Sequence, residues 1–273
     1  MITFISIFIF LFGLIVGSFL NVVIYRYNTG LSINGRSKCL SCNRQLKWYE
    51  LVPVFSFLFQ RAKCSKCGSK ISWQYPLVEL GTGTLFFLLY ISMQDMLMLF
   101  PKLAITIFLL EAVIGSLLVV IFVYDLKHKI IPNELVYSFS FISLIHLFLI
   151  TPPMFYKTNL FIWNLLAGPI LFLPFYILWR VSNGRWIGLG DGKLALGIGW
   201  LLGLTLGISA LIISFWLGAI FSLVLLLVFR LKQGSKNITM KTEVPFAPFL
   251  IIGTLVVFFF GIDVLSLNLL FNL

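Results

Sequence analysis

Long apolar runs recur along almost the whole chain, and this feature constrains the fold most strongly. A helix needs about 20 apolar residues to cross roughly 30 Å of hydrocarbon. Helices also suit lipid because their backbone hydrogen bonds are satisfied internally. The sequence therefore predicts an all-α integral membrane protein with about eight transmembrane helices. The apolar segments cover residues 3–25, 76–93, 103–124, 135–151, 159–179, 192–206, 208–229 and 245–262.

Composition and charge support this class and indicate an orientation. Hydrophobic residues make up 60% of the chain and charged residues 11%, whereas a soluble domain has about 25% charged residues. If the segments cross the membrane in turn, all but Lys102 and Lys157 of the 20 Lys and Arg residues lie on one side. Basic loops face the cytoplasm. We therefore attribute the net charge of +11 to the orientation of the chain in membrane lipid. We expect no nucleic-acid partner.

One polar stretch is long enough to form a separate module. We interpret residues 1–26 as a first transmembrane helix, because its apolar run is longer than the apolar core of a signal peptide, which has about 7 to 15 residues. Residues 27–75 then form a cytoplasmic module, and residues 76–273 form a polytopic membrane domain. A module this small usually needs a metal or disulfides to fold.

All four cysteines lie in that module, as two C-x2-C pairs. This spacing is typical of a zinc ribbon, in which four thiolates hold a tetrahedral Zn²⁺. Such a site has no open position, so we expect a structural ion. A pair of disulfides is an alternative that a reducing cytoplasm disfavours, and an iron–sulfur cluster is another. The predicted ligands are Cys39, Cys42, Cys64 and Cys67.

Two aspartates lie where apolar segments meet cytoplasmic loops. Asp125 follows the third segment, and Asp191 precedes the sixth. Carboxylates at membrane depth are costly and usually functional. Two that face each other share one proton, so one can accept a proton from water while the other donates one to a carbonyl. The pair therefore predicts an aspartyl hydrolase.

Each acidic residue also has a simpler interpretation. Asp125 can pair with a neighbouring lysine, and Asp191 can occupy a tight turn before a helix. Glu79 and Glu111 lie within apolar segments. They can tune the aspartate pair, bind a substrate amine or pair with a basic side chain. Paired carboxylates also occur in proton-coupled carriers.

Glycines surround Asp191 and continue beyond it. Gly188, Gly190 and Gly192 lack a Cβ atom, so an extended substrate can approach the backbone there. Further along, glycines recur every four residues, which allows a neighbouring helix to pack closely. These are Gly199, Gly203 and Gly207.

Several motifs, taken in order, resemble bacterial prepilin peptidases, the type IV leader peptidase family. The similarity extends from near residue 13 to about residue 200. It comprises the run from Gly17 to Arg26, both C-x2-C pairs, Trp48 to Ser56, Ile71 to Leu80, and the G-x-G-D motif from Gly188 to Asp191 followed by Gly192, Lys193 and Leu194.

The resemblance implies an activity and several residue roles. Asp125 and Asp191 match the catalytic pair, with Gly188, Gly190, Gly192 and Lys193 near the substrate. Family members cleave the short basic leader of prepilins or pseudopilins on the cytoplasmic side of the bacterial inner membrane. Many also methylate the new N-terminus with S-adenosylmethionine. For this activity the resemblance points to Glu79, Gly81 and Gly83.

The sequence is also consistent with two other functions. The first is a related G-x-G-D peptidase with a different substrate, although some of these enzymes lack the cysteine module. The second is a transporter or scaffold carrying a zinc ribbon. Transport predicts that ion flux, rather than proteolysis, depends on Asp125 and Asp191.

Overall fold

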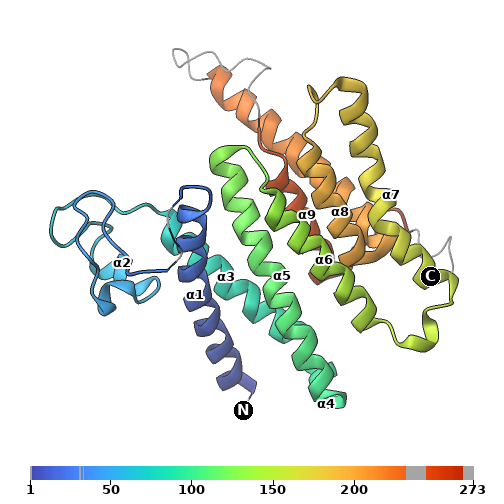
Figure 1. The fold of residues 1–273 in the computed structure, drawn as a ribbon, viewed down its shortest axis with the longest axis horizontal. Helices are drawn as coiled ribbons and strands as arrows, with labels where there is room; N and C mark the ends of the chain where they lie inside the picture. The colour runs from blue at the N-terminus through green and yellow to red at the C-terminus, as the bar shows by residue number, and fades with distance from the viewer. Residues whose placement is uncertain (1, 31, 33, 232–243, 267–273) are drawn as a thin grey trace. The chain divides into compact units, whose positions relative to one another are not determined.

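The computed structural model describes residues 2–30, 32, 34–231 and 244–266. Their regular elements are helical, with no named strand among them (Figure 1). Lys232, Lys236 and Lys241 of the last basic loop lie outside the described residues. The helices are α1 (Ile2–Arg26), η1 (Trp48–Leu51), α2 (Phe55–Phe59), α3 (Gln74–Ser92), α4 (Gln94–Leu99), α5 (Pro101–His128), α6 (Asn133–Ile150), η2 (Pro153–Phe155), α7 (Asn159–Ser182), α8 (Leu189–Leu231) and α9 (Ala247–Phe260).

Six of the described helices are long and apolar enough to cross a membrane. They are α1, α3, α5, α6, α7 and α8, while α9 is a shorter apolar helix. The all-α membrane class is confirmed. The eight expected segments correspond to these seven helices, because the segments 192–206 and 208–229 both lie in α8. The segment 245–262 forms α9, with 14 residues.

Helix α8 contains a break at Gly203, a few residues before the boundary that the sequence suggested. Gly203 has φ 78° and ψ −176°, a conformation that L side chains rarely adopt. The Asn164 side chain of α7 accepts a hydrogen bond from the Leu204 N–H at 3.4 Å, which satisfies a backbone group freed by the break.

The two halves of α8 pack against each other through small residues. A Cβ atom built on Gly207 would lie 3.7 Å from the Gly199 Cα, whereas eight residues of straight helix rise about 12 Å. The chain therefore turns back at Gly203. Gly199 also contacts α7, where its Cβ would meet the Ala167 carbonyl oxygen at 2.6 Å. The glycine stripe thus packs helices together, as the sequence predicted.

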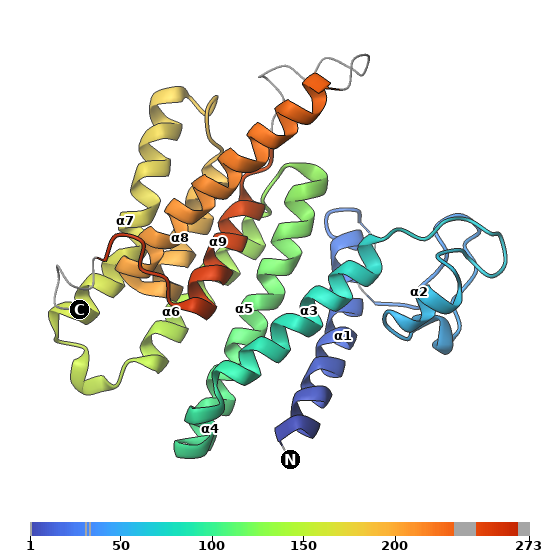
Figure 2. The ribbon, with the colours of Figure 1, turned by 180° about the vertical axis from the view of Figure 1, so that it is seen from behind.

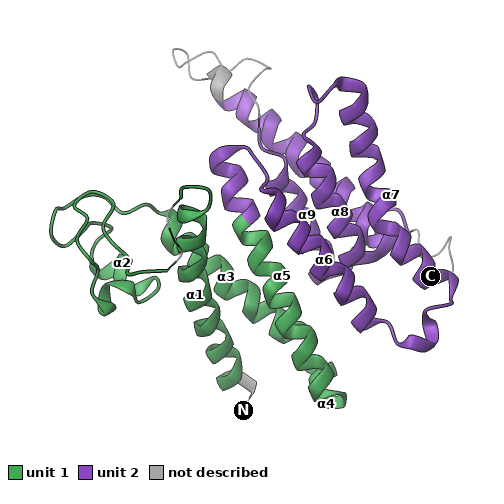
Figure 3. Ribbon diagram, viewed as in Figure 1, with its two compact units in different colours: residues 1–120 green, residues 121–273 purple. Residues whose placement is uncertain are grey.

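The chain divides into two compact units, residues 1–120 and 121–273 (Figure 3). In the first unit α1 packs along α3 (Figure 2). Glycines allow this approach, because a Cβ on Gly13 would lie 2.8 Å from the Gly83 Cα, and one on Gly17 would lie 2.7 Å from the Glu79 Cα. In the second unit α8 contacts α6, α7 and α9. The end of α5 belongs to this second unit, so Asp125 and Asp191 lie in the same unit.

Candidate active site and metal centre

The two predicted aspartates lie at helix ends within the second unit. Asp125 is in the last turn of α5, and Asp191 is in the first turn of α8. Asp125 is buried, with 4% of its surface exposed, and Asp191 is half-buried. The two carboxylates are close enough to interact electrostatically. The structure therefore brings together two residues that are far apart in sequence.

The connection from α5 to α6 supports this arrangement. Lys129 has a positive φ of 53°, and its N–H donates to the Asp125 carbonyl oxygen at 2.8 Å, which ends α5. Pro132 then precedes α6, and because proline has no backbone N–H it does not extend α5 into α6. Between them, Ile131 contacts the start of α8: a Cβ on Gly190 would lie 3.0 Å from the Ile131 Cβ. This contact links the loop after Asp125 to the turn before Asp191.

The three glycines around Asp191 have different surroundings. Gly190 faces Ile131, and a Cβ on Gly192 would lie 3.0 Å from the Phe175 Cβ of α7. Both glycines therefore allow close packing within the protein. Beside Gly188, in contrast, the nearest atom is the Asp191 Oδ2 at 3.7 Å. Gly188 is exposed, so it is the glycine that leaves space next to a carboxylate.

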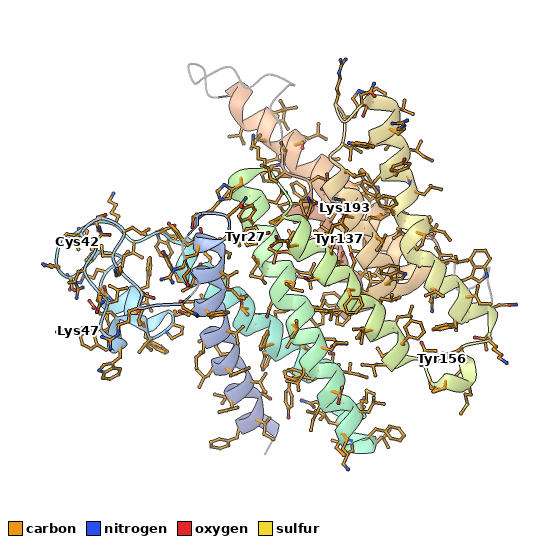
Figure 4. The ribbon with its side chains drawn as sticks, viewed as in Figure 1. Tyr27, Cys42, Lys47, Tyr137, Tyr156 and Lys193 are labelled. Carbon is orange, nitrogen blue, oxygen red and sulfur yellow. The ribbon has the colours of Figure 1, made fainter. Side chains whose placement is uncertain are left out.

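Three residues beyond the predicted set support the site: Ala247, Asn133 and Tyr137. The Ala247 N–H at the start of α9 donates to the Asp125 carboxylate. The Lys193 Nζ donates to the Asn133 Oδ1 at 2.8 Å and lies 4.9 Å from the centre of the Tyr137 ring (Figure 4). Lys193 thus ties α8 to the first turns of α6. The proline after Ala247 and the one before Asn133 are the sequence signals that mark these helix starts.

Replacing Gly190 by valine is expected to lower both stability and cleavage, since the new side chain overlaps Ile131. Overpacking of this kind costs about 1 to 3 kcal/mol. The double variant Gly190→Val/Ile131→Ala then recovers the melting temperature and the cleavage rate. Gly188→Ala is the control and keeps the wild-type melting temperature. If the double variant recovers stability but no cleavage, Gly190 serves substrate approach rather than packing.

The four cysteines of the first unit converge on one point. Their sulfur atoms all lie within 4.8 Å of one another, and the structure joins none of them in a disulfide. Four sulfurs placed about 2.3 Å from a tetrahedral zinc ion are about 3.8 Å apart, and the Cys39 and Cys67 sulfurs are 3.8 Å apart. The cluster can hold a metal ion, and its geometry disfavours the disulfide alternative.

The two C-x2-C pairs form matching turns. An antiparallel bridge joins Lys38 to Gln45 around the first turn, and another joins Lys63 to Lys70 around the second. The first cysteine of each pair accepts hydrogen bonds from backbone N–H groups within its own turn, and these lower the pKa values of Cys39, to about 6, and of Cys64. Thiolates are the form that binds a metal.

A partly buried ion pair between Arg44 and Glu50, together with Ser65, joins the two turns. Arg44 of the first turn donates two hydrogen bonds to Glu50, at 2.7 and 3.0 Å, and a third to the Ser65 hydroxyl of the second turn at 2.8 Å. Glu50 also accepts from the Lys47 N–H and the Ser65 hydroxyl. The bonds from Arg44, followed by those from Lys47 and Ser65, lower the pKa of Glu50 to about 2. Glu50 is therefore a structural carboxylate.

A cavity of about 890 Å³ lies between the cysteine module and the ends of α1 and α3. Its walls include Asn21 and Tyr25 of α1, Tyr75 and Glu79 of α3, and residues of both cysteine turns. Its volume is within the range of cofactor pockets. The cavity connects the predicted metal site to the residues that the resemblance linked to methylation.

Of the three residues linked to methylation, Glu79 and Gly83 lie on the face of α3 that packs against α1, and Gly81 lies on another face. Glu79 is buried and lines the cavity, where its Oε2 accepts from the Val54 N–H at 2.7 Å. Val54 has a φ of 62°, which is strained for a β-branched residue, so this bond stabilises a costly turn. Gly83 faces α1, where its Cβ would lie 2.8 Å from the Leu14 Cδ2, and Gly81 faces open space. Only Glu79 of the three lines the cavity.

The helical fold and the two sites define a polytopic membrane protein. It has an aspartate pair at its helix ends and a cysteine cluster in a polar module. Two family models match the chain: the bacterial peptidase A24 N-terminal domain over residues 11–93, and the type IV leader peptidase family over residues 112–223. Together with the relatives described next, these matches show that the chain belongs to the type IV leader peptidase family.

Curated relatives carry the name prepilin leader peptidase/N-methyltransferase. The one from Bacillus subtilis is 34% identical over 94% of this chain and 95% of its own length. The one from Myxococcus xanthus is 34% identical over 81% of this chain and 63% of its own length. The one from Stutzerimonas stutzeri is 27% identical over 91% and 88%. No solved structure matches the chain.

Proposed function

We propose that this chain is a membrane aspartic endopeptidase that removes the short basic leader of type IV prepilins or pseudopilins. The observation that supports this proposal most directly is the pairing of Asp125 and Asp191 at helix ends of one compact unit. Family membership supports the substrate class, since the curated relatives are named for prepilin leaders. The alternation of basic loops supports placing the site at the cytoplasmic face of the bacterial inner membrane.

The aspartate pair supplies the proton transfers of peptide hydrolysis. One carboxylate takes a proton from a water molecule as the water oxygen attacks the scissile carbonyl carbon. The other carboxyl group donates its proton to the carbonyl oxygen. When the tetrahedral intermediate collapses, the C–N bond breaks and a proton passes to the leaving amine nitrogen. The products are a leader with a new carboxyl group and a pilin with a free N-terminal amine.

Surrounding groups position the pair and its substrate. The Ala247 N–H orients the Asp125 carboxylate, and the bond from Lys193 to Asn133 holds the first turn of α8 beside α6. The space beside Gly188 suits an extended peptide. A side chain on residue 188 would lie next to the Asp191 carboxylate, and glycine leaves that space free. We assign Gly190 and Gly192 to the packing that supports this opening.

The polar module, residues 27–75, is proposed to hold one structural Zn²⁺. Four thiolates at tetrahedral spacing fit zinc and leave no position for a substrate. The zinc-bound turns then form one wall of the cavity beside α1 and α3. The role of the ion is to keep that wall folded.

A second activity, N-methylation with S-adenosylmethionine, is supported by the cavity of the first unit. If bound in this cavity, S-adenosylmethionine would supply a methyl group to the neutral N-terminal amine of the cleaved pilin, with S-adenosylhomocysteine and a proton as the other products. Glu79 and the Tyr25 and Tyr75 rings suit a cationic donor, since a carboxylate and aromatic faces both attract positive charge.

Glu79→Gln is expected to reduce methylation by about tenfold or more while cleavage continues. The amide that replaces the Glu79 carboxylate is neutral, and a hydrogen bond to a charged group contributes about 1.5 to 3 kcal/mol. The measurement is the ratio of methylated to unmethylated product, together with binding of radiolabelled S-adenosylmethionine. Asp95→Asn, an exposed carboxylate at the start of α4, is the matched control. Unchanged methylation in Glu79→Gln would place the donor elsewhere.

The test of the proposed peptidase is a membrane assay with a pilin precursor. The precursor carries a basic leader, a glycine at the junction and an apolar helix, and the product is identified by mass spectrometry. The wild-type chain is expected to release the leader, and a product heavier by one methyl group reports the second activity. Ion flux through vesicles with no leader release would support the carrier alternative instead.

A further inference from the structure

The cysteine module carries a run of exposed apolar side chains that its own core does not explain. They lie on η1, on α2 and on the turn between these helices. Trp48 is 80% exposed and Phe59 is 84% exposed, although large aromatic residues usually bury much of their surface. A cluster of exposed apolar side chains within one short segment indicates an interaction surface. Its residues are Trp48, Tyr49, Leu51, Val52, Phe55, Leu58 and Phe59, here called the aromatic patch.

The aromatic patch adjoins the start of a candidate membrane span. The ring of Phe57 in α2 packs against the ring of Trp73, with centroids 4.9 Å apart. Trp73 precedes the first residue of α3, a candidate membrane span, and Leu77 in its first turns is 63% exposed. Trp73 is itself exposed. The contact between Phe57 and Trp73 therefore joins α2 to the start of α3, and exposed apolar side chains lie on both.

Basic residues border the aromatic patch at both of its ends in the sequence. Lys47 precedes η1, and its Nζ lies 5.8 Å from the centre of the Tyr49 ring. Arg61 and Lys63 follow α2, and both are exposed. Aromatic side chains bordered by Lys and Arg are typical of protein surfaces at a membrane interface. Anionic lipid headgroups complement these cations.

The module is also held where the aromatic patch can reach the membrane. It is connected to α1 at one end and to α3 at the other, and both are candidate spans. In Figure 4, Lys47 lies further toward the N-terminal end of α1 than Tyr27, the residue that follows α1, whereas Cys42 lies near the level of Tyr27. Lys47, which directly precedes the aromatic patch, thus lies nearer the level of the α1 span than Cys42 of the first cysteine turn does.

We propose that the aromatic patch inserts into the lipid interface beside α1 and α3, and that it binds phospholipids with anionic headgroups. The module is then supported by lipid on its η1 and α2 face. The wall that it contributes to the cavity is held against the membrane ends of α1 and α3. This inference concerns the surface of the first unit and does not depend on the peptidase activity.

The test is site-specific photocrosslinking of the full chain in nanodiscs that mix neutral and anionic phospholipids. A benzophenone amino acid replaces Phe59, and mass spectrometry identifies the adducts. Phe8, an exposed residue of the α1 span, is the positive control, and Ser41, an exposed residue beside Cys42, is the negative control. We expect lipid adducts at Phe59 and Phe8, with none at Ser41. Anionic lipid is enriched among the Phe59 adducts relative to its share of the bilayer.

A second variant separates lipid binding from folding of the module. Trp48→Ser combined with Leu58→Ser is expected to reduce the lipid adducts at Phe59 while zinc content stays at the wild-type level. Adducts from Phe59 to a second copy of the chain, or to an added pilin precursor, in place of lipid would overturn the proposal. The absence of lipid adducts at Phe59 when Phe8 is labelled, or equal labelling at Ser41, would overturn it as well.

Discussion

Asp191→Asn is expected to lower the rate of leader cleavage by about 10²- to 10⁴-fold, the range that general acid–base groups contribute. Asparagine keeps the size of the side chain but can neither release nor accept the proton that the mechanism needs. Asp125→Asn is expected to lower the rate by a similar factor, because the two carboxyl groups interact and each carries out one of the two proton transfers of the same step. Initial rates with a purified pilin precursor measure both effects.

Glu134→Gln is the matched control for the aspartate variants. Glu134 is an exposed carboxylate in the first turn of α6, within the same compact unit. It is expected to keep a rate near wild type. Melting temperatures of all three variants close to wild type would show that the losses are chemical rather than structural. Normal cleavage by either aspartate variant would contradict the assignment.

Cys64→Ser is expected to remove zinc from the chain and to unfold the polar module. Structural zinc contributes apparent binding free energies of about 10 to 16 kcal/mol in small zinc-binding domains, and that energy is folding energy. A module of this size has too small a core to replace it. Cys64 is the buried member of the four, so its loss also exposes the interior of the cluster. Metal analysis measures zinc content, and limited trypsin digestion reports unfolding.

Ser69→Ala is the control for this variant. The Ser69 hydroxyl lies 3.1 Å from the Cys67 sulfur and 3.7 Å from the Cys39 sulfur, so it neighbours the cluster without being a predicted ligand. It is expected to retain zinc and resistance to trypsin. Wild-type zinc content in Cys64→Ser would contradict the four-thiolate site. Iron in place of zinc in the wild-type chain would favour a cluster of the iron–sulfur type.

The main features of the fold follow from local patterns, because lipid imposes strong rules on sequence. Apolar runs predict the helices, and the basic loops predict which ends share a side. The position of the break in α8 does not follow from the sequence pattern alone. A stripe of glycines marks it, but the stripe does not say which glycine turns. Gly203 is the turning residue because Asn164, distant in sequence, satisfies the Leu204 N–H there.

The candidate site also contains both residues that the sequence predicts and residues that only the structure reveals. Scarce carboxylates at helix ends pointed to Asp125 and Asp191 without any contact information. The sequence could not reveal Ala247 or Asn133, because their roles depend on which helix starts meet α5 and α8 in space. The need for glycine at position 190 also depends on a tertiary contact. The glycine spacing suggested substrate approach, whereas in the structure Gly190 lies beside Ile131.

The most direct test of the central claim is the cleavage rate of the double variant Asp125→Asn/Asp191→Asn beside those of the two single variants. Residues that act as one catalytic unit are not additive, since losing either removes the function of both. The account predicts that the double variant is no slower than the slower single variant. If the double variant loses the product of the two single factors, or if either single variant cleaves normally, Asp125 and Asp191 do not form a catalytic pair.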